Sequence, residues 1–143
     1  MAFKIIDGLP IQLMKVLVGS GGSTAGSLAV YSSGAAVLAA ANISANTIMG
    51  IFRDTVASAS YATIELLDNH LIEADFTGSS KSTLAATDLS TVFDLSDAAT
   101  INLDDTTVST GGFRPGAGGT TTDFFDNTNL KIRGKFPSTL RLY

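Results

Sequence analysis

The sequence predicts an all-β protein with at most one short helix. It should fold as a small sandwich or barrel with an extended N-terminal arm and long Gly/Thr-rich loops. Short apolar runs alternate with turn residues at intervals of about eight to twelve residues, the spacing of strands in such folds. Serine and threonine supply 32 of the 143 residues, and eleven aspartates stand against two glutamates. Threonine favours strands and aspartate favours turns, whereas exposed helices usually carry glutamate and lysine.

Length and composition predict one folded domain without covalent cross-links. A domain of 143 residues buries about two-thirds of the surface of its unfolded chain, which is enough for a stable core. The chain has no cysteine, so disulfide bonds and thiolate chemistry are excluded. We divide it into an N-terminal arm, residues 1–10, and a single β-rich domain, residues 11–143.

The N-terminal arm is apolar and cannot continue as a helix, because Gly8 and Pro10 interrupt it. An apolar terminal segment either folds onto its own domain or pairs with the edge of a neighbouring sheet. The sequence leaves both possibilities open. The arm residues that we expect to contact a partner protein or a neighbouring subunit are Phe3, Lys4, Ile5 and Ile6.

The first half of the domain contains four expected strands. Residues 11–18 are mostly apolar at both odd and even positions, so we expect this strand to be buried on both faces. A glycine-rich loop, residues 19–26, follows it. The other expected strands are residues 27–31 and 35–40, which flank a turn at residues 32–34, and residues 47–55.

Residues 61–76 fit two different structures. Asp68-Asn69 is a good turn between two apolar runs, which favours a hairpin of residues 62–67 and 71–76. A single amphipathic helix is the alternative, because three apolar residues lie at helical spacing. These residues are Ile64, Leu67 and Leu71.

The second half of the domain contains further short strands and a long Gly/Thr-rich loop at residues 114–122. In the last strand, Ile132 and Phe136 lie on one face. The expected strands are residues 89–95 and 100–103, separated by a turn at Ser96-Asp97, then 108–113 and 129–136.

Phe124 and Phe125 are adjacent, so in a strand one ring would face the core and the other would face outward. An outward-facing phenylalanine is a candidate anchor for a partner protein. The alternative is a loop that folds both rings over the core. We include both residues among the candidate interface residues.

The glycine-rich loop resembles a dinucleotide-binding loop only in part. Gly19 and Gly21 are in place, but Thr24 occupies the third glycine position. Residues 16–52 contain no acidic residue that could bind a ribose hydroxyl. We therefore interpret residues 19–26 as an inter-strand loop and keep binding of a nucleotide or another small ligand as an alternative.

The polar residues do not form a recognisable catalytic or metal-binding motif. His70 near Asp68 lacks the Gly-x-Ser-x-Gly turn of a hydrolase, and we expect it to be a turn residue in solvent. Asp104, Asp105, Asp123 and Asp126 lack the spacing of a calcium loop, so we expect turn caps. The sequence thus predicts no enzyme activity, catalytic residue, cofactor or metal.

Charge is distributed unevenly along the chain. Residues 65–126 hold eleven acidic and two basic residues, while residues 131–143 hold four basic residues and no acid. Such polarity can orient a protein on a partner, and the alternative is a solvated acidic body with a basic tail. The basic segment is too small for a nucleic-acid footprint. Residues 16–52 carry no charge, yet their longest apolar run, 35–41, is far shorter than the roughly 20 residues of a membrane span. We expect neither a nucleic acid nor a membrane as partner.

Four segments resemble the small capsid decoration (cement, or head accessory) proteins of tailed bacteriophages. They cover residues 26–103 and consist of patterned apolar residues rather than an active-site motif. The segments are Gly26-Ser-Leu-Ala-Val-Tyr, Ile48-Met-Gly-Ile-Phe, residues 55–66 ending in Ala62-Thr-Ile-Glu-Leu, and Thr87-Asp-Leu-Ser-Thr-Val-Phe-Asp-Leu-Ser-Asp-Ala-Ala-Thr-Ile-Asn.

The resemblance implies a structural virion protein that binds the outside of an icosahedral capsid and stabilises it. Its implied partners are the major capsid protein and further copies of itself, as a trimer. Its location would be the capsid surface, after synthesis in the host cytoplasm. The resemblance also implies an N-terminal arm that contacts the shell or the adjacent subunit, with Phe3, Ile5 and Ile6 in the matching place. Another virion component, such as a tail or head-fibre module, is the alternative.

Overall fold

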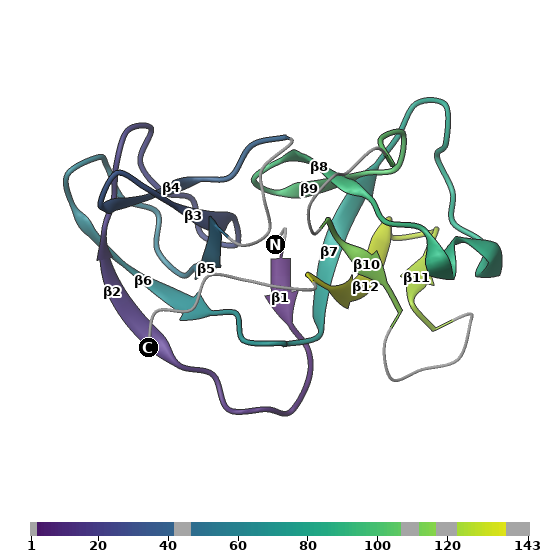
Figure 1. Cartoon of the computed structure of the whole chain (residues 1–143), viewed down its shortest axis with the longest axis horizontal. Coiled ribbons are helices and arrows are strands. Elements are labelled where there is room, and N and C mark those ends of the chain that lie inside the picture. Colours follow the sequence, from purple (N-terminus) through teal and green to yellow (C-terminus); the bar gives the residue numbers. More distant parts are fainter. Residues whose placement is uncertain (1–2, 42–46, 107–111, 117–122, 137–143) are drawn as a thin grey trace.

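The computed structural model describes residues 3–41, 47–106, 112–116 and 123–136 (Figure 1). Its regular structure consists of two β-sheets and a short 3-10 helix, η2 (Ala86–Ser90). The expected all-β, sandwich-like class is therefore confirmed. The described part of the chain holds no helix with the length and apolarity that crossing a bilayer requires.

The first sheet has five strands in the order β2-β6-β5-β3-β4, and every neighbouring pair is antiparallel. Its edge strands meet where Val18 forms a parallel bridge with Ala36, and the Gly19 N–H donates to the Ala36 carbonyl at 2.8 Å. We call this sheet the curled sheet. Its strands are β2 (Leu13–Leu17), β3 (Leu28–Ser32), β4 (Ala35–Leu38), β5 (Ile48–Phe52) and β6 (Tyr61–Leu66).

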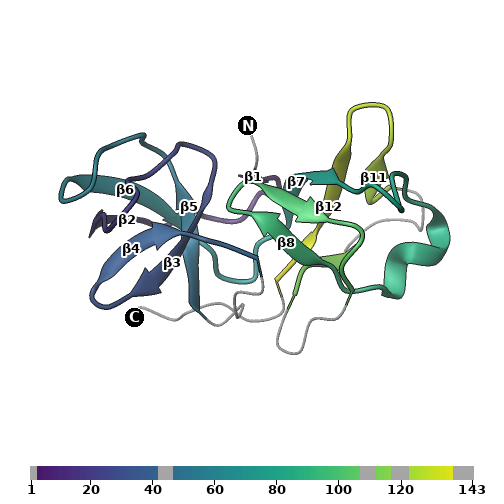
Figure 2. The ribbon, with the colours of Figure 1, turned by 90° about the horizontal axis from the view of Figure 1, so that it is seen from above.

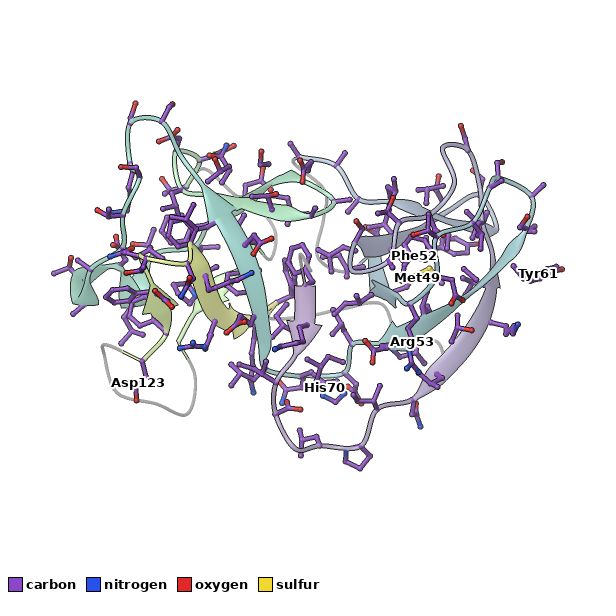
Figure 3. The ribbon with its side chains drawn as sticks, turned by 180° about the vertical axis from the view of Figure 1, so that it is seen from behind. Met49, Phe52, Arg53, Tyr61, His70 and Asp123 are labelled. Atoms are coloured by element: carbon purple, nitrogen blue, oxygen red, sulfur yellow. The ribbon has the colours of Figure 1, made fainter. Side chains whose placement is uncertain are left out.

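The curled sheet encloses its own apolar core, because alternate side chains of its strands point inward. Figure 3 shows two of these side chains, Met49 and Phe52, inside the curl. The buried members of this core are Val16, Val18, Ala29, Ala36, Met49, Phe52, Ala62, Ile64 and Leu66.

The second sheet, which we call the open sheet, has the main order β10-β12-β7-β9-β8. One edge of β7 is shared, because β1 pairs antiparallel with its first half and β9 pairs parallel with its second half. β11 pairs with β12. The strands are β1 (Phe3–Ile5), β7 (Ile72–Thr77), β8 (Asp94–Asp97), β9 (Thr100–Asn102), β10 (Arg114–Pro115), β11 (Phe125–Asp126) and β12 (Lys131–Lys135).

The two sheets lie side by side, and a larger core joins them (Figure 2). Side chains of β3 and β5 that do not point into the curl, such as Leu28 and Ile51, belong to this core. Ile72 and Ile132 of the open sheet also belong to it, as does Phe3 from the arm. Burial of such side chains supplies the main driving force for folding.

Residues 61–76 form two strands, but these strands are not the predicted hairpin. β6 belongs to the curled sheet and β7 to the open sheet, and Asp68-Asn69 forms the bend between the sheets. Asn69 has a φ of 59°, a conformation that asparagine tolerates better than most residues. The turn was recognisable from sequence, but the same turn residues can connect either the two strands of a hairpin or two strands in different sheets.

The predicted burial of residues 11–18 on both faces is wrong. In β2 only Val16 is buried, whereas Leu13, Met14, Lys15 and Leu17 are exposed. The open sheet covers the outer side of β3 and β5. β2 is separated from these two strands by β6, so its outer side is left uncovered. One face of β2 lines the inside of the curl, and the other faces solvent.

Several other expectations agree with the structure. β3 and β4 form a hairpin whose turn contains Ser33 (φ 51°) and Gly34 (φ 84°), and β5 and β12 lie within their predicted ranges. The strand expected at residues 89–95 is wrong in its bounds, because its first residues belong to η2 and β8 begins at Asp94. The turn between β8 and β9 lies at residues 98–99 rather than at Ser96-Asp97. Of the expected strand at 108–113, residues 108–111 lie outside the described residues, as do residues 117–122 of the long loop.

Candidate functional site

In the described part of the chain, exposed apolar residues gather on two neighbouring strands. Leu13 and Leu17 of β2 are 53% and 41% exposed, and Tyr61 of β6 is 64% exposed. We call these three residues the β2 face. The extended segment that leads into β2 adds two further exposed apolar residues, Leu9 and Ile11.

The strand register explains why these side chains lie together. Leu17 is directly opposite Tyr61, Lys15 is opposite Thr63, and Leu13 is opposite Glu65. Directly opposite residues project to the same side of a sheet. Their neighbours on the inner side, such as Val16 and Ala62, fill the curl. Figure 3 shows Tyr61 pointing away from the body of the molecule.

Single exposed apolar residues are common, but neighbouring ones on adjacent strands are not. The β2 face itself is apolar, and a charged residue of each sign, Lys15 and Glu65, lies beside it on the same side of the two strands. Apolar and aromatic side chains with a few polar groups around them are typical of protein-protein interfaces. The side chains of this surface are therefore suited to contact with another protein.

The sequence contained a signal for this face that a count of apolar residues misses. Lys15 stands in the middle of the odd-numbered residues of β2, and a lysine is rarely buried without a partner. Its position marks the whole odd-numbered row as exposed. Tyr61 became part of the site only through the pairing of β2 with β6, which sequence alone does not give.

The N-terminal arm folds onto its own domain. β1 pairs with β7, and the Phe3 N–H donates to the Gly26 carbonyl at 2.9 Å. Phe3 is 1% exposed and packs near Phe136, with 6.4 Å between ring centroids. Ile5 and Ile6 are half-buried, so Lys4 is the exposed member of the arm residues predicted to contact a partner.

The adjacent phenylalanines lie elsewhere in the open sheet. Phe124 is buried, while Phe125 in β11 is half-buried and packs against the larger core that joins the two sheets. Their ring centroids are 4.9 Å apart with an interplanar angle of 70°, an edge-to-face contact. β7 and β12 lie between β1 and β11, so the structure does not bring the arm and this pair into one surface.

His70 is buried rather than exposed to solvent, which corrects the expectation from the sequence. Its Nδ1 lies 3.0 Å from Oδ1 of Asp7, and the other Asp7 oxygen accepts the Leu71 N–H at 2.7 Å. Figure 3 places His70 where the arm leaves the open sheet. The partner is 63 residues away in the chain, and no local pattern could have identified it.

Asp7 is held as a carboxylate. Partial burial raises its pKa, but hydrogen bonds from His70 and from the Leu71 and Leu9 N–H groups outweigh that effect, and the pKa is lowered. These bonds fasten the end of the arm to the start of β7.

An open groove of about 300 Å³ adjoins this pair. A His-Asp pair beside a groove provides the base and its orienting group, but a hydrolytic triad also requires a nucleophile. Among the described residues, the lining of the groove includes no serine, threonine, cysteine or lysine. The lining residues are Leu9, Pro10, Gln12, Leu66, Asp68 and His70.

The glycine-rich loop is hydrogen-bonded to its own chain. The Ser23 N–H donates to the Val56 carbonyl at 2.9 Å, and the Gly26 N–H donates to the Phe52 carbonyl at 2.8 Å. A Cβ at Gly22 would lie 2.6 Å from the Val56 oxygen, so close packing requires glycine there. A strand, β3, follows the loop instead of the helix of a dinucleotide-binding fold.

The predicted role of two aspartates as turn caps is confirmed. Asp104 accepts the N–H groups of Ser79, Ser80 and Lys81, and those of Ser79 and Lys81 contribute most to lowering its pKa. Asp126 accepts from Asn129 and Thr128, and the Asn129 side chain contributes most to lowering the pKa of Asp126. Each carboxylate thereby fixes a loop of the open sheet.

No known protein family, curated protein or solved structure matches the chain. Among the described residues, the β2 face brings exposed apolar side chains together on two paired strands, and the folded chain itself does not cover it.

Proposed function

We propose that this protein is a structural virion component that binds the outside of an icosahedral phage capsid and stabilises the shell. The observation that carries the proposal is the β2 face, where Leu13, Leu17 and Tyr61 are exposed on adjacent strands. The resemblance of residues 26–103 to capsid decoration proteins supplies the identity of the partner. The major capsid protein is the partner, and the protein acts as a trimer without chemistry of its own.

A small β-rich molecule suits this role for a physical reason. A capsid repeats the same surface many times, and a trimer presents three β2 faces to it at once. Linking several weak contacts in one assembly raises the overall affinity without any single strong contact. The modest size of the β2 face is therefore compatible with stable decoration.

Binding to undecorated, expanded capsids of the phage that encodes this chain tests the proposal. The wild-type protein should bind saturably, in proportion to the lattice sites. A variant with Leu13→Ser, Leu17→Ser and Tyr61→Ser should bind at least about tenfold more weakly, because anchor side chains dominate interface energies. All three residues are exposed, so the melting temperature should change by only a few degrees.

Tyr31→Ser is the matched control. Tyr31 is 49% exposed, comparable with Tyr61, but it lies in β3 opposite Ala36, which belongs to the core inside the curl, so it projects to the opposite side of the sheet from the β2 face. This variant should decorate capsids as the wild type does. Absence of saturable binding by the wild-type protein would refute the proposal, and labelled protein found only on the tail would favour a tail module instead.

A further inference from the structure

The main-chain groups of β2 point alternately toward β6 and away from it. The Leu66 N–H donates to the Gln12 carbonyl, and the Val18 N–H donates to the Ser60 carbonyl, both at 2.9 Å. In an antiparallel pair, every second residue bonds the same neighbour. The N–H and C=O groups of even-numbered residues therefore point toward β6. Those of Leu13 and Lys15 point toward the opposite edge of β2.

Among the residues that the structure describes, little pairs with that opposite edge. β2 meets β4 only at its end, where Val18 bridges Ala36 and the Gly19 N–H donates to Ala36. The bridge is parallel, and β4 begins at Ala35, directly after the turn at Ser33-Gly34. Residues 13–16 therefore run past the tip of the β3–β4 hairpin. Within the described ranges, no strand pairs with them on this side.

The free edge and two residues of the β2 face, Leu13 and Leu17, belong to the same strand. Leu13, Lys15 and Leu17 carry exposed side chains, and the main-chain groups of Leu13 and Lys15 point outward. An edge strand with free N–H and C=O groups is a template for strand addition, and exposed apolar side chains give the added strand a face to cover. Both requirements for strand addition meet on one five-residue element.

We propose that β2 receives an extended strand from the partner protein along this edge. The partner strand has apolar residues at alternate positions, which cover Leu13 and Leu17, and a carboxylate opposite Lys15. This inference deepens the proposed function, because it names the kind of segment that the capsid protein would supply.

Charge distinguishes this partner from a second copy of the chain. Two β2 strands paired antiparallel would match Leu13 with Leu17 in the register that places Lys15 opposite Lys15. Like charges directly opposite each other destabilise a strand pair, and lysine on an edge strand discourages self-pairing. A partner strand with a glutamate or aspartate at that position removes the repulsion and adds an attraction.

Two substitutions at one position separate the main-chain contact from the charge. Lys15→Ala removes the charge and keeps the N–H, and it should weaken capsid binding by about two- to fivefold. Lys15→Pro also removes the N–H that faces the open edge, and it should weaken binding by a further factor of about five. Proline is tolerated at the solvent side of an edge strand, so the bonds between β2 and β6 should persist.

A peptide probe tests strand addition without any capsid. The probe is an acetylated heptapeptide of the sequence Thr-Val-Thr-Glu-Thr-Val-Thr, in which the two valines and the central glutamate project to one face. Its controls carry a central lysine or an N-methylated central residue. By amide NMR titration, the glutamate peptide should bind about fivefold more tightly than the lysine peptide and slow hydrogen exchange at the Lys15 N–H. The N-methylated peptide should not bind.

The outcomes separate this inference from the proposed function. Peptide binding without capsid binding would leave strand addition in place and refute the capsid assignment. Capsid binding that is unchanged in Lys15→Ala and Lys15→Pro would refute strand addition and leave the capsid assignment in place. Slow exchange of the Lys15 N–H in the isolated protein would also overturn the inference, because a second copy or another segment of the chain would already occupy the edge.

Discussion

A single carboxylate, Asp7, fastens the N-terminal arm to the rest of the molecule. It accepts the Leu71 N–H and contacts His70, while the Ile6 N–H donates to the Leu71 carbonyl at 3.0 Å. Because the pKa of Asp7 is lowered in the folded state, its carboxylate stabilises the fold at pH values above 3.8, its unperturbed pKa. This contribution is lost as the pH falls below that value.

Replacing Asp7 tests this arrangement. Asp7→Ala should lower the free energy of unfolding by about 1–3 kcal/mol at pH 7, because two buried or half-buried donors lose their acceptor. The difference from the wild type should shrink when the pH falls below 3.8. Urea unfolding from pH 7 to pH 3 measures both effects. Asp97→Asn is the control, since the Asp97 side chain accepts the N–H of Ala99, two residues along the chain, and an equal loss there would contradict a special role for Asp7.

Gly50 lies in β5 directly opposite Leu66 of β6. A Cβ at this position would be 2.0 Å from the Glu65 carbonyl oxygen, so Gly50→Ala should destabilise the curled sheet by at least about 2 kcal/mol. Gly8→Ala is the matched control, because nothing lies within 4 Å of a Cβ there. Thermal unfolding of both variants measures the difference in stability. Equal melting temperatures would contradict the packing seen at Gly50.

At the scale of the element, β1 is an integral strand of the open sheet of its own chain. It fills the half of the β7 edge that β9 leaves open. Its central side chain points outward as Lys4, while Phe3 enters the core.

Phe3→Ala should therefore cost about 3–5 kcal/mol of stability, the usual range for a buried phenylalanine. The neighbouring Lys4→Ala should change stability by no more than about 0.5 kcal/mol, since Lys4 is exposed. Denaturant unfolding measures both. A small effect of Phe3→Ala would show that the arm is not part of the folding unit and is available to a partner.

Strands were predictable from sequence because alternation and turn residues are local. β3, β4 and β12 follow directly from such patterns, as in the turn at Ser33-Gly34. The assignment of β6 and β7 to different sheets was not predictable, because the Asp68-Asn69 turn permits either connection. The exposed face of β2 was missed for a related reason: which strand faces solvent depends on the order of strands across the sheet.

The candidate site depended even more on long-range structure. Asp7 and His70 come together across 63 residues, and Tyr61 joins Leu17 only through the pairing of β2 and β6. The sequence did indicate a protein without a recognisable catalytic motif and with apolar segments suited to contacts. It could not locate the contact surface, because exposure is a property of the assembled sheets.

At the scale of the whole molecule, the proposal requires a trimer whose shell-binding surface remains free. Light scattering with size-exclusion chromatography should give about three times the chain mass of 14.7 kDa. The variant with Leu13→Ser, Leu17→Ser and Tyr61→Ser should keep this mass if the β2 face binds the shell. A monomeric wild-type protein would contradict the trimer, and a variant that dissociates would place the β2 face between subunits.

The contact between Phe3 and Phe136 joins the two ends of the described chain in one core. During translation, at about 5–20 residues per second, β1 leaves the ribosome on the order of 10 s before β12 is complete. Until then Phe3 lacks one of its neighbours. The nascent polypeptide therefore cannot reach its final packing stepwise from the first residue, and a product terminated before β12 would expose apolar surface that chaperones and proteases recognise.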